Sequence, residues 1–192
     1  MKKRFCFSCL AFLFPLLLSI LVLMGNIDYS LEEALKVLKV IENIQMEAEK
    51  GSTGELRKVE LSESQLNSYI AYRIETEKQD IMKQLKLKLF KDNKIEGEAL
   101  IDLREQDIPD YLKPRMTILF GAKVEVNEGK VRVNMKDIFL EYQRIKPYVV
   151  DLIILIASRI EKTEPWSIKD WYELPYGIKD IKTTHQKLIA YY

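Results

Sequence analysis

The segment Pro147–Arg159 constrains the fold most, because it is apolar almost all the way round. Its sequence is PYVVDLIILIASR, and Asp151 is its only charge before Arg159. A helix of this length is roughly 20 Å long, too short to cross a hydrocarbon core of about 30 Å. The helix must therefore be covered by protein, by a bound ligand or by the surface of a bilayer.

The N-terminus joins a basic start, Lys2–Arg4, to an apolar run, Phe5–Met24. Such a run forms either a secretory signal or a single membrane-spanning helix. Cleavage requires small residues one and three positions before the cut. A cut after Gly25 would place Leu23, which is not small, three positions before it. We therefore expect an anchor over residues 1–27 in the cytoplasmic membrane, with the domain outside the cytoplasm, or a secreted domain if the run is cleaved.

Charge and reactive residues exclude several classes of function. A formal net charge of +1 gives no basic excess for nucleic acid. Both cysteines, Cys6 and Cys9, lie in the apolar run, and the single histidine, His185, falls in an expected turn. No second histidine is available for a zinc site, and no glycine-rich phosphate loop or nucleophile elbow occurs. We expect no enzyme activity, metal or cofactor.

Two capping boxes predict two helices before the sheet. Ser30 and Glu33 begin a helix that runs to about Lys50 and is closed by Gly51–Gly54. It is interpreted as a stalk helix that docks on the domain, and a heptad seam that forms a dimer is the alternative. Its expected apolar stripe comprises Leu31, Ala34, Leu35, Leu38, Ile41, Ile44 and Ala48.

The second capping box, Ser62 with Gln65, begins a helix that loses its pattern near Glu77. The expected organisation is an anchor at 1–27, a stalk helix and linker at 28–60, and one domain at 61–192. The buried stripe of the second helix comprises Leu66, Tyr69, Ile70 and Ile74.

Beyond this helix the apolar period changes from 3.6 to 2, which predicts antiparallel strands. Two strands over 81–89 and 95–104 turn at Asp92–Asn93, and two more over 118–126 and 131–142 turn at Asn127–Gly129. The inward residues of the last strand change phase, from Val131, Val133 and Met135 to Ile138, Leu140 and Tyr142. This phase change predicts a β-bulge near Lys136–Asp137, which would bend the sheet around the apolar helix.

The tail begins with an aromatic loop, Glu164–Ile178, and ends with two short strands around His185–Gln186. Aromatic rings with a polar edge suit a membrane interface or the mouth of a lipid groove. The alternative is that these rings fasten the last hairpin to the sheet. The candidates for this rim are Trp166, Trp171 and Tyr172.

The order of these parts resembles bacterial YpmS-type and related extracytoplasmic proteins, which in turn resemble tubular lipid-binding and AsmA-like domains. The resemblance lies in a Leu-Ser-x-x-x-Leu-Asn helix start at 61–67, a run of antiparallel strands, an apolar helix and a closing Leu-Pro-Tyr-Gly-Ile at 174–178. It implies a curved antiparallel sheet around a helix, an apolar groove for acyl chains, and no catalytic residues.

The sequence therefore predicts an α+β fold with a membrane anchor helix, two amphipathic helices, and a curved antiparallel sheet of four to six strands on the helix at 147–159. The expected function is non-catalytic binding of a lipid or acyl chain, with a membrane as partner. An envelope protein partner bound by a scaffold with a filled core is the alternative. The groove candidates are Ile118, Phe120, Val124, Val133, Ile153 and Ile156.

Overall fold

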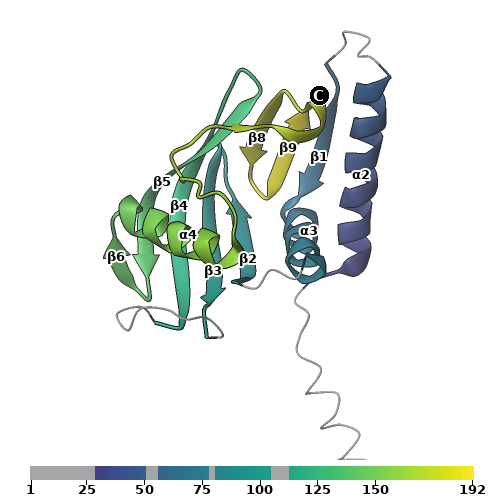
Figure 1. Cartoon of the computed structure of the whole chain (residues 1–192). Helices are drawn as coiled ribbons and strands as arrows, with labels where there is room; N and C mark the ends of the chain where they lie inside the picture. The colour runs from purple at the N-terminus through teal and green to yellow at the C-terminus, as the bar shows by residue number, and fades with distance from the viewer. Residues whose placement is uncertain (1–28, 51–55, 78–80, 105–112) are drawn as a thin grey trace, which may run out of the picture.

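The computed structural model describes residues 29–50, 56–77, 81–104 and 113–192 (Figure 1). The expected anchor at 1–27, the closing segment Gly51–Gly54 and residues 105–112 lie outside these ranges. In the described ranges three α-helices and two antiparallel sheets form an α+β fold, which confirms the expected class. None of these three helices is both long and apolar enough to span a membrane.

The larger sheet is a curled half-barrel in which each strand pairs antiparallel with the next along the chain (Figure 1). A two-residue strand, β7, is added on the outer side of β5. The sheet comprises β2 (Met82–Leu89), β3 (Lys94–Asp102), β4 (Arg115–Asn127), β5 (Lys130–Leu140), β6 (Gln143–Ile145) and β7 (Tyr172–Glu173).

Residues alternate along these strands between a packed concave face and a solvated convex face. On β3, Ile95 and Ala99 are buried, whereas Glu96 and Glu98 are exposed. Strand side chains point to opposite faces with a period of two, so the apolar alternation in the sequence corresponds to the concave face. The expected four- to six-stranded antiparallel sheet is confirmed.

Three two-residue turns connect the hairpins, and their central residues adopt positive φ, as type I′ turns require. Asp92–Asn93 and Glu128–Gly129 were expected as turns, but Glu141–Tyr142 was not. The prediction that Tyr142 faces inward is wrong, because this turn sends the chain back as β6 and leaves Tyr142 87% exposed.

The predicted β-bulge is confirmed at Lys136. Between Gly121 and Ala122 of β4, the paired residue of β5 changes from Asp137 to Met135, so Lys136 has no partner of its own. The extra residue keeps both Met135 and the fully buried Ile138 on the concave face. A bulge also increases strand twist, which contributes to the curl of the half-barrel.

Helix α4 (Pro147–Glu161) lies across the concave face, with Pro147 in its first turn (Figure 1). Val150, Ile153 and Ile154 are buried in the main core beside the inner residues of β3 and β4. The opposite side of the helix is open, since Leu152 is 39% exposed. The sheet therefore covers one side of the apolar helix and not its whole girth.

Helices α2 (Leu31–Glu49) and α3 (Glu63–Thr76) begin at the predicted caps, Ser30 and Ser62. The two helices pack together, and Ala34 and Val37 are buried on α2. Part of the predicted α2 stripe is wrong: Leu31 and Leu35 are 53% and 49% exposed. Their side chains lie outside the narrow strip that α3 covers.

Helix α3 caps the edge of β2 with side chains in place of a further strand. Asn67 donates to the Leu87 carbonyl and accepts from the Leu87 N–H, both at 2.8 Å. The Glu63 carboxylate accepts from the Leu89 N–H at 2.7 Å. These bonds pair backbone groups that an uncovered edge strand would expose, which limits edge-to-edge association.

The smaller sheet pairs the strand between α2 and α3 with the C-terminal hairpin. Strand β1 (Lys58–Ser62) pairs with β9 (Lys187–Tyr191), which pairs with β8 (Asp180–Thr184). The hairpin of β8 and β9 was expected, but β1 has no counterpart among the predicted elements. The turn η1 (Pro175–Gly177) packs against α2, and the Thr183 hydroxyl donates to the Phe90 carbonyl at 2.7 Å.

Candidate functional site

Three of the predicted groove residues lie in the main core and are packed by protein. Ile118 and Ile153 are 6% and 5% exposed in the cluster beneath α4. Phe120 contacts this cluster and a second one, and its ring lies over Gly97, where a Cβ atom would meet ring atoms at 2.1–2.7 Å. The floor of the half-barrel is therefore filled beneath the helix.

The other three groove candidates lie elsewhere. Val124 and Val133 belong to the second cluster, in which Val133 is only half buried. Ile156 is half buried on α4 and belongs to neither cluster. The structure thus does not bring the six residues together into one groove, and only Val133 of the six lines the pocket at the seam between β5 and α4.

The loop that follows α4 is fastened across this seam by Asp151. Its carboxylate accepts from the Ser167 hydroxyl at 2.9 Å and from the Ile168 N–H at 3.1 Å. The Asp170 carboxylate accepts from the Ser167 N–H at 3.1 Å, which closes a short turn. As a result Ile168 is buried in the main core, and Lys169 beside it stays exposed.

The three aromatic rim candidates lie together on this loop. Trp166 is 50% exposed and meets Tyr172 edge to face, with ring centroids 6.1 Å apart. The Tyr172 hydroxyl donates to the Ser167 carbonyl at 2.7 Å, and partial burial, with Asp170 and Asp151 nearby, raises the pKa of Tyr172.

The third aromatic, Trp171, is 38% exposed and stacks on Arg132 of β5, with the guanidinium carbon 4.5 Å from the ring centroid. The adjoining strand β7 pairs with Lys130 and Val131 of the same strand. The aromatic residues therefore hold this loop against β5, and the last hairpin belongs to the other sheet.

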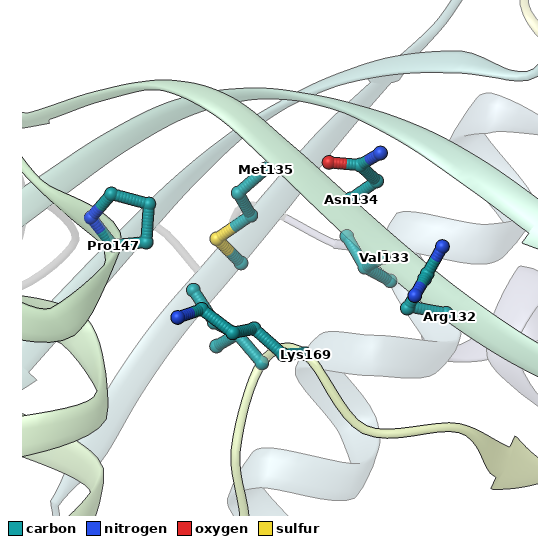
Figure 2. A pocket seen from close by; sticks show the side chains of 7 residues that line it. Arg132, Val133, Asn134, Met135, Pro147 and Lys169 are labelled. Atoms are coloured by element: carbon teal, nitrogen blue, oxygen red, sulfur yellow. The ribbon is translucent and has the colours of Figure 1, made fainter.

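A pocket of about 240 Å³ lies between β5, the start of α4 and this loop (Figure 2). Met135 extends from β5 into the space opposite Lys169, and Pro147 flanks it at the start of the helix (Figure 2). The volume is a little below the usual range of small-molecule sites, about 300–1,000 Å³. The lining residues are Arg132, Val133, Asn134, Met135, Pro147, Ile168 and Lys169.

Two cationic side chains lie at the rim of this pocket, and only one of them, Arg132, is paired with a carboxylate. Arg132 donates to the Glu125 carboxylate at 2.5 Å, and Asn134 donates to the other oxygen at 2.8 Å. Both hydrogen bonds lower the pKa of Glu125, and the bond from Asn134 has the larger effect. Lys169 is exposed and makes no ion pair with a described carboxylate, so its charge is available to a ligand.

The edge of β5 beside the pocket is open between its two short neighbours. β7 pairs with Lys130 and Val131, β6 pairs with 138–140, and no other described strand pairs with β5 on this side. In an antiparallel ladder, hydrogen-bonded pairs alternate with non-hydrogen-bonded pairs. The pair that closes the two-residue turn, Asn127 with Lys130, is hydrogen-bonded, so Val133 and Met135 fall in non-hydrogen-bonded pairs with β4. Val133 and Met135 therefore direct their backbone groups away from β4 and towards this opening.

Most of this site was not predicted from the sequence. Among its lining residues only Val133 was a candidate, although the bulge that places Met135 and a helix beginning at residue 147 were both expected. Ile168 and Lys169 were missed because Asp151, 17 residues before Ile168, brings them to the pocket through a side-chain hydrogen bond. Strand alternation and helical periodicity carry no signal for a contact of that kind.

Chemistry outside the pocket is sparse in the described ranges. They contain no group of three or more histidine, cysteine, aspartate or glutamate side chains that could hold a metal ion. His185 is exposed in the turn between β8 and β9, as expected.

No protein-family model, curated protein sequence or solved structure matches this chain. The site is therefore defined by its own geometry: a small pocket with an apolar wall, a cationic rim and exposed aromatic side chains alongside.

Proposed function

We propose that this protein is a membrane-tethered module that binds one acyl chain of a lipid in the pocket between β5 and α4. The observation that carries the proposal is the composition of the pocket, in which Val133, Met135 and Ile168 supply apolar surface and Lys169 supplies a charge at the rim. Burial of apolar surface favours binding of the chain, by about 25 cal/mol per Å² removed from water. A lysine at the rim favours an anionic head group.

The surroundings of the pocket support binding close to a bilayer. Trp166, Trp171 and Tyr172 are exposed on one side, and Leu152 and Tyr148 are exposed on α4. Amphipathic aromatic rings favour the membrane–water interface. The apolar run at 5–24 would tether the domain to the cytoplasmic membrane, outside the cytoplasm, so that the pocket meets lipid at the outer surface.

Native mass spectrometry of the full-length protein, released from detergent, tests this proposal. We expect the wild type to retain about one lipid per chain that organic extraction identifies. Met135→Trp should lose it, because the larger ring fills the pocket, whereas Met46→Trp, on the exposed face of α2, should retain it. Equal lipid retention by the two variants would contradict the proposal.

A second candidate function, the docking of an envelope protein, is favoured by one observation, the open edge of β5. An extended peptide segment could add to this edge through the backbone groups of Val133 and Met135. Val133→Pro removes one N–H from the opening without touching the ladder to β4. If docking is the function, the wild type should carry no bound lipid, and Val133→Pro should lose a protein partner that the wild type captures.

A further inference from the structure

The convex face of the half-barrel carries an unfavourable arrangement of charge. Lys94 of β3 and Lys123 of β4 are direct cross-strand partners. Their neighbours Ile95 and Ala122 are buried on the concave face, so both lysines project from the convex side. Like charges directly opposite one another in a sheet are destabilising.

No described carboxylate forms an ion pair with these lysines, and Glu125 feels the charge of Lys123 only through space. Lys91, Lys94, Lys123 and Lys136 are all exposed, and none lies within 4.0 Å of a described carboxylate oxygen. Glu125, the next residue on the face of Lys123, is already bound by Arg132 and Asn134.

These four lysines line one hollow of about 640 Å³, which reaches from the turn of β2 and β3 to the bulge of β5. The carboxylates in its wall are Asp92, Glu96 and Asp137, and Asp137 is paired with Arg144 at 2.7 Å. The wall therefore holds four exposed lysines and only two carboxylates, Asp92 and Glu96, that form no ion pair with a described residue.

A second hollow, of about 460 Å³, adjoins the first. The two share Glu96, Gly121 and Asp137, so they form one continuous surface. Leu119 and Phe139, direct cross-strand partners, supply apolar surface in this second part. Gly121 keeps the passage open, because a Cβ atom there would lie in contact with only the Asp137 Cβ atom, at 3.9 Å.

We propose that this convex surface is a second binding site, for an organic phosphate with a short apolar tail. The phosphate would lie among Lys94, Lys123 and Lys136, and the tail would lie over Leu119 and Phe139. Several ammonium groups suit a doubly charged phosphate, because each acts as a point charge on its oxygens. The cross-strand pair of lysines then costs stability in the empty protein and is neutralised when the ligand binds.

Hexyl phosphate is a suitable probe, titrated calorimetrically into the full-length protein held in nanodiscs of neutral lipid. The titration uses the Met135→Trp background, so that the pocket between β5 and α4 is filled and does not contribute. We expect binding that is at least tenfold weaker in Lys94→Gln/Lys123→Gln. The matched double variant Lys39→Gln/Lys179→Gln removes the same charge from exposed sites elsewhere and should bind as the background does.

Folding and the role of the tail are tested in the same series. Lys94→Gln/Lys123→Gln should have an unchanged or higher melting temperature, because it removes a like-charge pair, so weaker binding would not reflect unfolding. Inorganic phosphate and hexanol should each bind at least tenfold more weakly than hexyl phosphate. The proposal is overturned if hexyl phosphate does not bind, if both double variants bind it equally, or if inorganic phosphate binds as tightly.

Binding of vesicles that contain phosphatidylglycerol distinguishes recognition of a free organic phosphate from recognition of a membrane surface. A monomeric organic phosphate should compete with such vesicles at these lysines. If the vesicles bind through Lys94 and Lys123 while hexyl phosphate does not, the surface recognises a bilayer and the proposal is wrong.

Discussion

Asp151 lies in the second turn of α4, and its carboxylate connects the helix to the aromatic loop. It accepts two hydrogen bonds, from the Ser167 hydroxyl and the Ile168 N–H. The charge of Asp151, among the apolar residues of the helix, thus has a structural role, which is to bring Ile168 into the core and Lys169 to the pocket rim.

Asp151→Ala should lower the free energy of unfolding by about 1.5–3 kcal/mol, because bonds to a charged acceptor are lost and a buried N–H is left unpaired. Urea unfolding followed by tryptophan fluorescence measures this change. Glu164→Ala in the same loop alters an exposed carboxylate and should change stability by about 0.5 kcal/mol or less. Equal effects of the two substitutions would show that Asp151 does not hold the loop.

Asp102, at the end of β3, gives stability a dependence on pH. Its carboxylate accepts from the Arg104 guanidinium at 2.6 and 2.9 Å, and this interaction lowers the pKa of Asp102 to about 2. The ordinary value is about 3.9, so the stabilisation is present above that pH and is lost as pH falls towards 2.

The stability advantage of the wild type over Asp102→Asn should therefore shrink between pH 5 and pH 2. Denaturant unfolding at each pH unit measures it, and Arg104→Gln should show the same loss of pH dependence. An advantage that stays constant over this range would rule out the ion pair as its source.

At the scale of elements, the sequence predicted the helices and strands whose apolar residues recur at a fixed spacing over many positions. Alternation predicted the four long strands because their concave face is apolar along its length. The reciprocal hydrogen bonds of Ser62 and Gln65 place the start of α3 as expected. The bulge at Lys136 followed from a change of phase, since two apolar sets on one face require an extra residue.

Strands β6 and β7 were missed because they have three and two residues, too few to show an alternation. Strand β1 has five residues, as many as the predicted β8 and β9, but it runs directly into the cap of α3 and so gives no separate signal. The turn at Glu141–Tyr142 was missed because Tyr142 continues the apolar alternation and has no glycine or asparagine beside it. The pocket was missed for a related reason, since its walls come from segments joined only by long-range contacts.

The buried side of α4 is tested by two neighbouring residues. Ile153→Asp places an unpaired charge in the main core and should cost about 3 kcal/mol or more. Leu152→Asp lies on the open side of the same helix and should cost about 1 kcal/mol or less. Thermal unfolding followed by circular dichroism compares the two variants.

If Ile153→Asp does not fold, Ile153→Val keeps the comparison measurable. It should cost about 0.5–1.5 kcal/mol, because one buried methylene is removed. Leu152→Val should cost less than Ile153→Val. The reverse order would place the wrong side of α4 against the sheet.

At the scale of the whole molecule, the half-barrel separates the two proposed binding surfaces. The concave side is covered by α4 over the main core and by side chains of α3 and β9 over the second cluster. The apolar pocket, the aromatic side chains and Lys169 meet at the seam between α4 and β5. The convex side carries the lysine-lined hollow and adjoining apolar surface. The domain is thus a filled sheet-and-helix core with a small site at its seam, and not an open tube.

Photo-crosslinking in a bilayer tests whether an acyl chain binds at that seam. The full-length protein in liposomes is irradiated with a fatty acid that carries a diazirine near its chain end, and the adducts are mapped by peptide mass spectrometry. We expect adducts on segments 130–137 and 166–171, and their loss in Met135→Trp but not in Met46→Trp. Adducts confined to residues 5–24, or unchanged by Met135→Trp, would show that the seam between β5 and α4 does not bind the acyl chain.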